Sequence, residues 1–329
     1  MKTASKLDKV ILLAMTLAAV AMVFTPALAS AQGVPPVVWT KSAFPFDNGQ
    51  APSVAISGLV IVEVREDTSG GLWSLTGKIQ EDGSVKWATS PSQYDSGYAP
   101  SIAITGNTVI EVHQAGTGEG ELMYHTGKLA IGGKVIWAAS SSKYDDGLAP
   151  SVAVAGQTVI EVHQAGSGVG PLWYHTAEIQ MNGDVVWNQG GSFKYDNGVA
   201  PSVAVAGSTV IEVHQAGTTE GPLYYHAAEI QANGSVVWAT SAFKFDNGLA
   251  PSVSASGPTA VEVHQAGSGV GALWFHTVAL QSDGTVKFSG SARYDNGVAP
   301  RVSVAGPTIL EVHQAEVGSG ALYYHAAAY

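Results

Sequence analysis

The stretch PSVAVAGQTVIEVHQAGSGVGPLWYHTAEIQMNGDVVWNQ, from Pro150 to Gln189, decides the fold. It contains four runs rich in Val, Ile, Trp, Tyr and Thr: Pro150–Gly156, Thr158–Ala165, Leu172–Gln180 and Asp184–Gln189. These residue types favour β-strands, and short segments with turn-forming residues separate the runs. The stretch therefore predicts a four-stranded antiparallel meander.

The same unit recurs along the chain. The aromatic residue of its fourth run returns at intervals of 48, 50, 50, 51 and 50 residues, at Trp39, Trp87, Trp137, Trp187, Trp238 and Phe288. A four-stranded repeat of about 50 residues has the size of one β-propeller blade. The chain is therefore expected to contain six blades.

The two ends of the chain predict how the repeats are arranged. The last repeat ends with Ala321–Tyr329 and lacks a fourth strand, whereas Pro36–Ser42 resembles a fourth strand and precedes the first full repeat. If the N-terminal strand completes the last blade, no sheet edge is left free. An open β-solenoid is the alternative, but it has no reason to omit a strand at one end and supply it at the other. We predict an all-β, six-bladed β-propeller closed by its N-terminal strand.

The first 31 residues are expected to be a secretory signal peptide. Lys2, Lys6 and Lys9 form a basic start, Val10–Phe24 is almost entirely apolar, and small residues around Ala31 suit cleavage. The apolar run is shorter than the roughly 20 residues of a membrane span, so we expect no membrane anchor. The mature protein is then secreted or periplasmic.

Residues 32–329 are expected to form a single propeller domain without disulfides, since the chain contains no cysteine. The net charge of the whole chain is −11, and removal of the signal leaves 12 basic and 25 acidic residues. A surface this acidic repels phosphate backbones, so nucleic acid is not an expected partner. No cofactor and no metal are expected.

A Glu and a His stand two residues apart in the second run of five repeats, in the motif EVHQ. Because side chains alternate along a strand, Glu161 and His163 point to the same side. In the register that we favour, Glu161 faces His175 on the next strand and His163 lies beside Trp173. A slip of one residue would bring Thr176 opposite Glu161 instead.

Two hypotheses explain this repeated pattern. In the first, the pairs are buried between blades and stabilise them, because a buried Glu requires a partner. In the second, equivalent ligand pockets form at the ends of the blades that carry the loops between the second and third runs. There an aromatic ring stacks on a sugar, and polar groups bind its hydroxyls. The candidate ligand-binding residues are Glu111, His113, Gln114, Tyr124, His125, Glu161, His163, Gln164, Trp173, His175, Glu212, His214, Gln215, Tyr224, His226, Glu262, His264, Gln265, Trp274, His276, Glu311, His313, Gln314, Tyr323 and His325.

The first repeat departs from this pattern. It has Arg65 in place of the first His and Leu75 in place of the second. We therefore expect up to five similar sites rather than six. If the histidines are structural, Arg65 is expected to pair with Glu63 or Asp67.

Each repeat also carries a D-x-G step before Ala-Pro. Its aspartates are Asp47, Asp95, Asp145, Asp196, Asp246 and Asp295. We interpret the step as a tight turn rather than a Ca²⁺ site, because the fuller spacing of a calcium loop is absent. The Gly-rich loops such as GSGVG are interpreted as hairpin loops rather than phosphate cradles, because no helix follows them.

The first run of each repeat, which lies nearest the axis of a propeller, has no titratable residue except Arg301. This composition argues against a single catalytic centre on the axis.

In its tandem blades the mature chain resembles the β-propeller lectins of bacteria and fungi. Members that bind fucose use an Arg, a Glu and a Trp at each site between blades. Glu161 and Trp173 match two of these parts, but no Arg recurs, so fucose specificity is not implied.

The resemblance implies a secreted, non-enzymatic protein that binds glycans or cell-surface polysaccharide at several equivalent sites. A protein-interaction scaffold is the alternative, and a hydrolase or lyase is a third.

Overall fold

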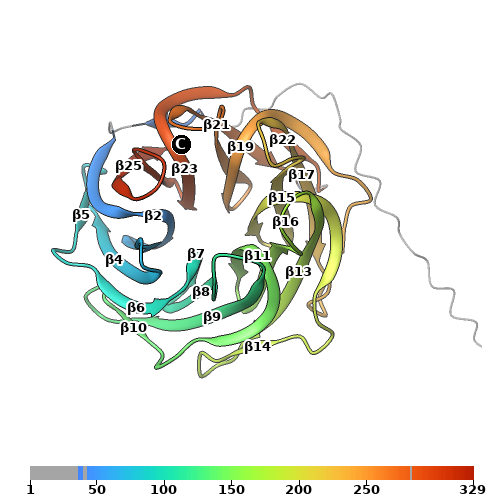
Figure 1. Cartoon of the computed structure of the whole chain (residues 1–329), viewed down its shortest axis with the longest axis horizontal. Helices are drawn as coiled ribbons and strands as arrows, with labels where there is room; N and C mark the ends of the chain where they lie inside the picture. The colour runs from blue at the N-terminus through green and yellow to red at the C-terminus, as the bar shows by residue number, and fades with distance from the viewer. Residues whose placement is uncertain (1–35, 40–42, 282–283) are drawn as a thin grey trace, which may run out of the picture.

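The computed structural model describes residues 36–39, 43–281 and 284–329. All regular secondary structure in these ranges is β. The strands form six antiparallel sheets around a central axis (Figure 1). The predicted six-bladed β-propeller is confirmed, and the blades are numbered here from the first full repeat.

Each blade uses equivalent strands, taken from the axis outward. Innermost are the strands β2 (Phe44–Ser57), β7 (Tyr98–Thr105), β11 (Ser142–Ala155), β15 (Phe193–Ala206), β19 (Phe243–Ser256) and β23 (Ala292–Ala305). Second are β3 (Val60–Glu66), β8 (Thr108–Gln114), β12 (Thr158–Gln164), β16 (Thr209–Gln215), β20 (Thr259–Gln265) and β24 (Thr308–Gln314). Third are β4 (Gly71–Ile79), β9 (Gly120–Leu129), β13 (Gly170–Ile179), β17 (Gly221–Ile230), β21 (Gly271–Leu280) and β25 (Gly320–Ala328). The outer edge contains β1 (Val38–Trp39), β5 (Val85–Trp87), β6 (Ser92–Ser96), β10 (Val135–Trp137), β14 (Val185–Trp187), β18 (Val236–Trp238) and β22 (Val286–Phe288).

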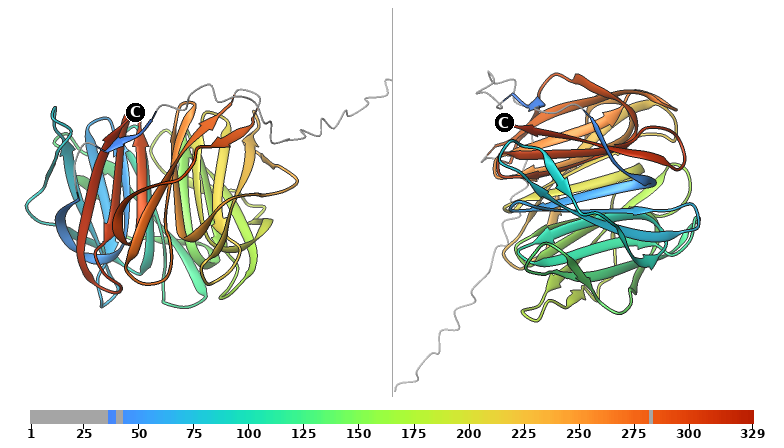
Figure 2. Two further views of the ribbon diagram at one scale, coloured as in Figure 1. Left: turned by 90° about the horizontal axis from the view of Figure 1, so that it is seen from above. Right: turned by 90° about the vertical axis from the view of Figure 1, so that its left-hand side faces the viewer.

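The expected hairpin register between the second and third strands is confirmed. In blade 3, Glu161 pairs with His175 and His163 pairs with Trp173. The hairpin loops between these strands lie on one face of the ring, which we call the upper face. Figure 2 shows the strands running between this face and the opposite one.

The D-x-G step is not a tight turn, which corrects the expectation. Residues 142–147 of β11 pair with β9 at the outer edge of blade 2, and the second half of the same strand pairs with β12 in blade 3. The step therefore lies within a strand that crosses from one blade to the next. A register shift between Lys143 and Asp145 and another between Leu148 and Ser151 bend this strand, so no separate turn is needed.

The ring closes as predicted from the chain ends. Val38 and Trp39 pair with Ala328 and Ala327 of β25, so the N-terminal strand completes blade 6. Trp39 also stacks on Tyr294, with ring centroids 5.0 Å apart. Strands β1 and β25 therefore hold each other, and blade 6 gains its outer strand from β1.

The hydrophobic core lies between the blades rather than around the axis. Each of six clusters combines buried residues of two neighbouring blades. Ile110 and Val112 of blade 2, for example, pack with Val159 and Ile179 of blade 3. Each blade thus buries both of its faces against neighbours, as repeat architectures require.

The predicted signal peptide lies outside the described residues. In the part of the chain that is described, no helix has the length and apolar character to cross a membrane.

Candidate functional site

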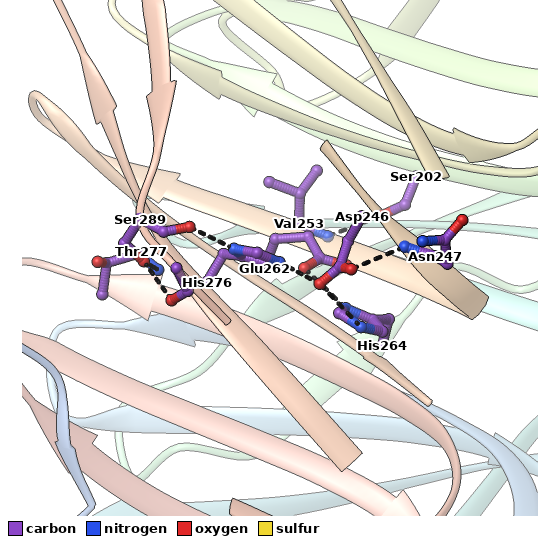
Figure 3. A network of polar contacts seen from close by, with 10 residues as sticks. Ser202, Asp246, Asn247, Val253, Glu262, His264, His276, Thr277 and Ser289 are labelled. Carbon is purple, nitrogen blue, oxygen red and sulfur yellow. Dashed lines mark hydrogen bonds and ion pairs between the residues drawn. The ribbon is translucent and has the colours of Figure 1, made fainter. Parts of the chain in front are cut away.

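A cluster of four titratable side chains connects blade 4 to blade 5. Asp246 lies on the outer edge of blade 4, and Glu262, His264 and His276 belong to blade 5. His264 Nδ1 donates to Glu262 over 3.1 Å, and His276 Nε2 donates to Asp246 over 2.9 Å (Figure 3). His276 Nδ1 also donates to the backbone oxygen of Ser289. Glu262 therefore holds His264 within blade 5, and Asp246 of blade 4 holds His276 of blade 5.

The same cluster recurs at four further interfaces. We call the five sets the interface clusters, and the other four are Asp95 with Glu111, His113 and His125; Asp145 with Glu161, His163 and His175; Asp196 with Glu212, His214 and His226; and Asp295 with Glu311, His313 and His325. In each set the hydrogen-bond partner of the Glu is the His two residues away on its own strand. The sequence suggested the opposite His as the partner, but that His faces the Asp of the preceding blade.

The D-x-G glycine allows the histidine to approach the crossing strand. A Cβ atom at Gly147 would lie only 2.7 Å from Cδ2 of His163, and one at Gly198 would lie 2.6 Å from Cδ2 of His214. No larger residue fits this space without displacing the ring. The Asp and the Gly of the step are thus both parts of the blade interface.

Aromatic rings cover the clusters from the outside. At the interface between blades 2 and 3, Tyr144 stacks on Trp187 with ring centroids 4.3 Å apart, and Trp187 lies 5.1 Å from the His175 ring. Burial raises the pKa of Tyr144 well above its usual value, and the charge of Glu161 beside its hydroxyl adds to the shift. The Tyr144 hydroxyl therefore stays protonated where it faces this carboxylate.

All of the predicted ligand-binding residues of the EVHQ motif are buried, and so is the second His of each of these blades. The five glutamates are fully buried, the ten histidines are at most 4% exposed, and the five glutamines are 5–8% exposed. These side chains therefore offer little surface to a ligand. Their geometry favours the structural hypothesis, in which they join blades; a role in ligand contact stays a prediction.

The charges within the clusters stabilise each other. Burial alone would lower the pKa of His163, but the carboxylates of Glu161 and Asp145 outweigh it and raise the pKa above its usual value. The pKa values of the equivalent His113, His214, His264 and His313 are raised for the same reason. Burial alone would raise the pKa of Asp196, but the hydrogen bond from His226 and other interactions lower it.

Blade 1 replaces the histidine chemistry with a permanent cation. Arg65 Nη1 donates to Glu63 over 2.7 Å and Arg65 Nη2 donates to Asp47 over 2.6 Å. The predicted pairing with Glu63 is confirmed, but Asp67 is not the partner, because it accepts hydrogen bonds from Trp73 and Ser69. Burial raises the pKa of Glu63 to about 8, although Arg65 opposes the shift.

The accessible side chains lie beyond the clusters on the same face of each blade. In blade 3, His163 is followed across the sheet by Trp173 and then Lys194. Cross-strand partners point to the same side, so these three residues form a row from the buried interior to the surface. Trp173 is half-buried and Lys194 is exposed. We call the outer two residues of such a row a rim pair.

Rim pairs differ among the blades. An aromatic residue stands opposite a cation in blades 3, 4 and 5 only; the six pairs are Trp73 with Gln93, Met123 with Lys143, Trp173 with Lys194, Tyr224 with Lys244, Trp274 with Arg293, and Tyr323 with Pro45. The four cations were not among the residues predicted to bind a ligand, although each stands two residues before the Asp of the D-x-G step.

Tyr124 does not lie beside His113, where a ligand-binding aromatic residue was predicted. The residue beside His113 is Met123, and alternation along the strand places Tyr124 on the opposite face. There Tyr124 packs against the next blade, 5.6 Å from the Trp187 ring centre. Blade 2 therefore has no aromatic residue in its rim pair.

One interface cluster also has the composition of a metal site. Single ligand atoms of Asp246, His264 and His276 lie within 4.8 Å of one another. A carboxylate and two imidazoles suit zinc. However, the hydrogen bond from His276 to Asp246 already satisfies this carboxylate without an ion. The absence of a metal therefore stays a prediction.

Comparison with known protein families finds no match, and comparison with curated protein sequences finds none either. Several solved structures are similar. The fucose-specific lectin from Aleuria aurantia is 12% identical, with a TM-score of 0.56 over 86% of this chain and 97% of the lectin. A 6-phosphogluconolactonase-like protein from Bacteroides uniformis is 11% identical, with a TM-score of 0.52 over 82% of this chain and 87% of its own. Trypanosoma rangeli sialidase is 11% identical, with a TM-score of 0.52 over 88% of this chain and 58% of the sialidase.

These similarities define the class of protein, a β-propeller, and at this level of identity they show the fold alone. The neighbours include both a sugar-binding lectin and enzymes, so the fold does not choose between binding and catalysis. That choice depends on the side chains of the candidate sites.

Proposed function

We propose that this chain is a secreted, non-enzymatic protein that binds carbohydrate through the rim pairs of its upper face. The observation that carries the proposal is the row that ends in Trp173 and Lys194. A half-buried indole ring offers an apolar face on which a sugar ring can stack. An exposed ammonium group beside it can donate hydrogen bonds to hydroxyl or carboxylate oxygens of the same sugar.

The buried interface clusters support this arrangement indirectly. His163 lies directly behind Trp173 in its row, and Glu161 and Asp145 hold His163. A rigid row keeps the indole ring in place, which reduces the entropy that binding must overcome. The residues of the EVHQ motif are in this proposal positioning residues rather than ligand contacts.

In three neighbouring blades the rim pair combines an aromatic ring with a cation, and this limits the number of equivalent sites to three. Blade 4 has Tyr224 with Lys244, and blade 5 has Trp274 with Arg293. Weak sites of this kind gain strength when a polyvalent surface engages several of them at once. A polysaccharide or a glycan-covered cell surface is therefore the proposed partner.

Two further considerations support binding rather than catalysis. The glutamates and histidines of the interface clusters are buried at five similar places, whereas a catalytic centre needs its acid and base once and within reach of the substrate. The Aleuria aurantia lectin shows that this fold is compatible with sugar binding. Secretion follows from the predicted signal peptide and is part of the proposal.

Glycan arrays followed by calorimetry with the mature protein test this function. We expect binding that is lost when Trp173, Tyr224 and Trp274 are all changed to Ala. Met123→Ala is the matched control, because Met123 occupies the same position in a blade without a rim aromatic ring, and it should leave binding unchanged. A folded protein that binds no glycan would refute carbohydrate binding. Unchanged glycan binding by the triple variant would instead show that the sites lie elsewhere.

A further inference from the structure

The inner strands enclose a cavity on the axis of the propeller. Its volume is about 210 Å³, and all six blades line it. The ring around this axis is seen end on in Figure 1. Because the inner strands have a sheet neighbour on one side only, part of their backbone N–H groups face the cavity and need other partners.

Serine side chains supply these partners around most of the ring. Each Ser accepts a hydrogen bond from the backbone N–H at the same level of the next blade, over 3.2–3.3 Å. The pairs are Ser53 with Ile102, Ser101 with Val152, Ser151 with Val203, Ser202 with Val253 (Figure 3) and Ser252 with Val302. Each hydroxyl uses a lone pair in this contact and retains its hydrogen as a donor.

Arg301 interrupts the ring in blade 6. It occupies the position that Ser holds in the other five blades, and among the described residues it is the only charged one that lines the cavity. A guanidinium group accepts no hydrogen bond, so Arg301 provides no acceptor for Val54, the equivalent residue of blade 1. Between blades 6 and 1, the Arg301 guanidinium and the Val54 N–H are both hydrogen-bond donors. Each of the other five interfaces pairs one donor with one acceptor.

In the described part of the chain, no acidic neighbour balances the charge of Arg301. The Arg301 side chain is half-buried. Its Nη1 donates a hydrogen bond to the carbonyl oxygen of Pro300 over 3.0 Å. Among the described residues, no carboxylate forms an ion pair with it. Burial lowers the pKa of Arg301, and no acidic group counteracts this effect. A partly buried cation without a partner is unfavourable, and an anion would relieve this.

We propose that the axial cavity binds one small oxyanion, a carboxylate or a phosphate, at Arg301. The planar guanidinium presents two parallel N–H groups that match the oxygens of such a group. The hydroxyls of Ser53 and Ser252, which flank Arg301 in the ring, and the N–H of Val54 supply further donors. A cavity of this size admits a small anion or the acidic group of a larger molecule. This site is separate from the rim pairs and does not depend on the proposed carbohydrate binding.

Arg301→Ser is the decisive variant, because it restores the residue that five blades already use. Inorganic phosphate and acetate are titrated into the mature protein at constant ionic strength, and binding is followed by calorimetry. We expect one site per chain and affinity about tenfold or more weaker in Arg301→Ser. Lys86→Ser is the matched control, since it removes an exposed cation of the outer strand β5, away from the cavity and from the rim pairs, and should leave anion affinity unchanged.

Thermal unfolding gives a second, independent measurement. Phosphate or acetate should raise the unfolding midpoint of the wild-type protein and of Lys86→Ser but not that of Arg301→Ser. Arg301→Lys keeps the charge without the planar fork and should show an intermediate response. The proposal is overturned if neither anion binds the wild-type protein, or if Arg301→Ser binds them as tightly as the wild type. Responses to phosphate alone or to acetate alone identify which oxyanion the site prefers.

Discussion

The side-chain oxygen of Gln114 accepts a hydrogen bond from the backbone N–H of Ala149 over 2.8 Å, and Ala149 adopts a φ of +49°. A left-handed backbone is unfavourable for a residue with a Cβ atom. An alanine at positive φ recurs at all six crossings, and the acceptor is a Gln at five of them and Glu66 at the sixth: Ala51 with Gln314, Ala99 with Glu66, Ala149 with Gln114, Ala200 with Gln164, Ala250 with Gln215, and Ala299 with Gln265. The last residue of the EVHQ motif therefore secures the strand that enters the next blade.

Loss of this acceptor should destabilise the ring. In Gln164→Ala, the N–H of Ala200 and the carbonyl of Gly166 lose their partner, and we expect unfolding free energy to fall by about 1–3 kcal/mol. Urea unfolding measures this change. Gln164→Glu is the control, because Glu66 already accepts from Ala99 in blade 1, and it should lose less stability than the alanine variant. Equal losses in both variants would contradict this role.

Substitution of an alanine at positive φ by Val and by Gly should have opposite effects on stability. Ala149→Val places a β-branched residue at positive φ and should destabilise the protein by about 2 kcal/mol. Ala149→Gly removes the strain but increases the entropy of the unfolded chain, so its stability should lie between unchanged and about 1 kcal/mol higher. Thermal unfolding of both variants tests this, and a glycine variant as unstable as the valine variant would be inconsistent with strain at this position.

Stability should decrease as the pH rises above neutrality. Histidines whose pKa is raised on folding, such as His163 and His214, stabilise the protein fully below the unfolded pKa near 6.5, and this contribution is lost as the pH rises through the folded pKa. Glu63 acts in the same direction, because its pKa rises from 4.5 to about 8 on folding.

The aspartates cause stability to fall at low pH. The pKa of Asp196 is lowered from 3.8, so its contribution is present above that value and is lost at lower pH. Unfolding midpoints between pH 3 and pH 9 should therefore peak between about pH 4 and 6.5. NMR titration of the five EVHQ histidines should give pKa values above 6.5. A midpoint that keeps rising from pH 6.5 to pH 8 would disprove this prediction.

The closing strand should depend on its aromatic stack. Trp39→Ala removes the ring that contacts Tyr294 and Phe275 and should lower stability by about 3 kcal/mol. Trp39→Phe should retain most of the stability, because blade 5 uses Phe288 in the equivalent position, stacked 4.4 Å from Phe245. Denaturant unfolding compares the two. A Trp39→Ala protein as stable as wild type would show that the N-terminal strand does not secure the ring.

Glycan binding should weaken in steps as rim aromatics are removed. On a glycan-coated surface, changing Trp173, then Trp274, then Tyr224 to Ala should reduce retention progressively, because each change removes one of several linked sites. For a soluble single sugar, calorimetry should show fewer sites with unchanged affinity at those that remain. Complete loss of surface binding and of monovalent binding after one substitution would indicate a single site instead.

The repeat pattern was sufficient to predict most of the fold. The spacing of Trp39 and its equivalents indicated six blades, and the missing last strand indicated closure by the N-terminus; both are confirmed. The register of Glu161 with His175 was also predicted correctly, since hydrophobic alternation allows few alternatives. The D-x-G step was interpreted wrongly because its composition suits a turn, whereas pairing with the third strand of the preceding blade holds it within a strand.

Periodicity and side-chain alternation were enough to predict the number of blades, their strand order and the face on which the Glu-His pairs lie. The contacts of those pairs became visible only in the folded ring. Asp145 and His163 are far enough apart in the chain that local spacing says nothing of their contact, and it is the packing of blade on blade that brings them together. The same packing buries the EVHQ side chains and leaves Trp173 and Lys194 accessible, so the position of the surface available to a ligand depends on the closed ring.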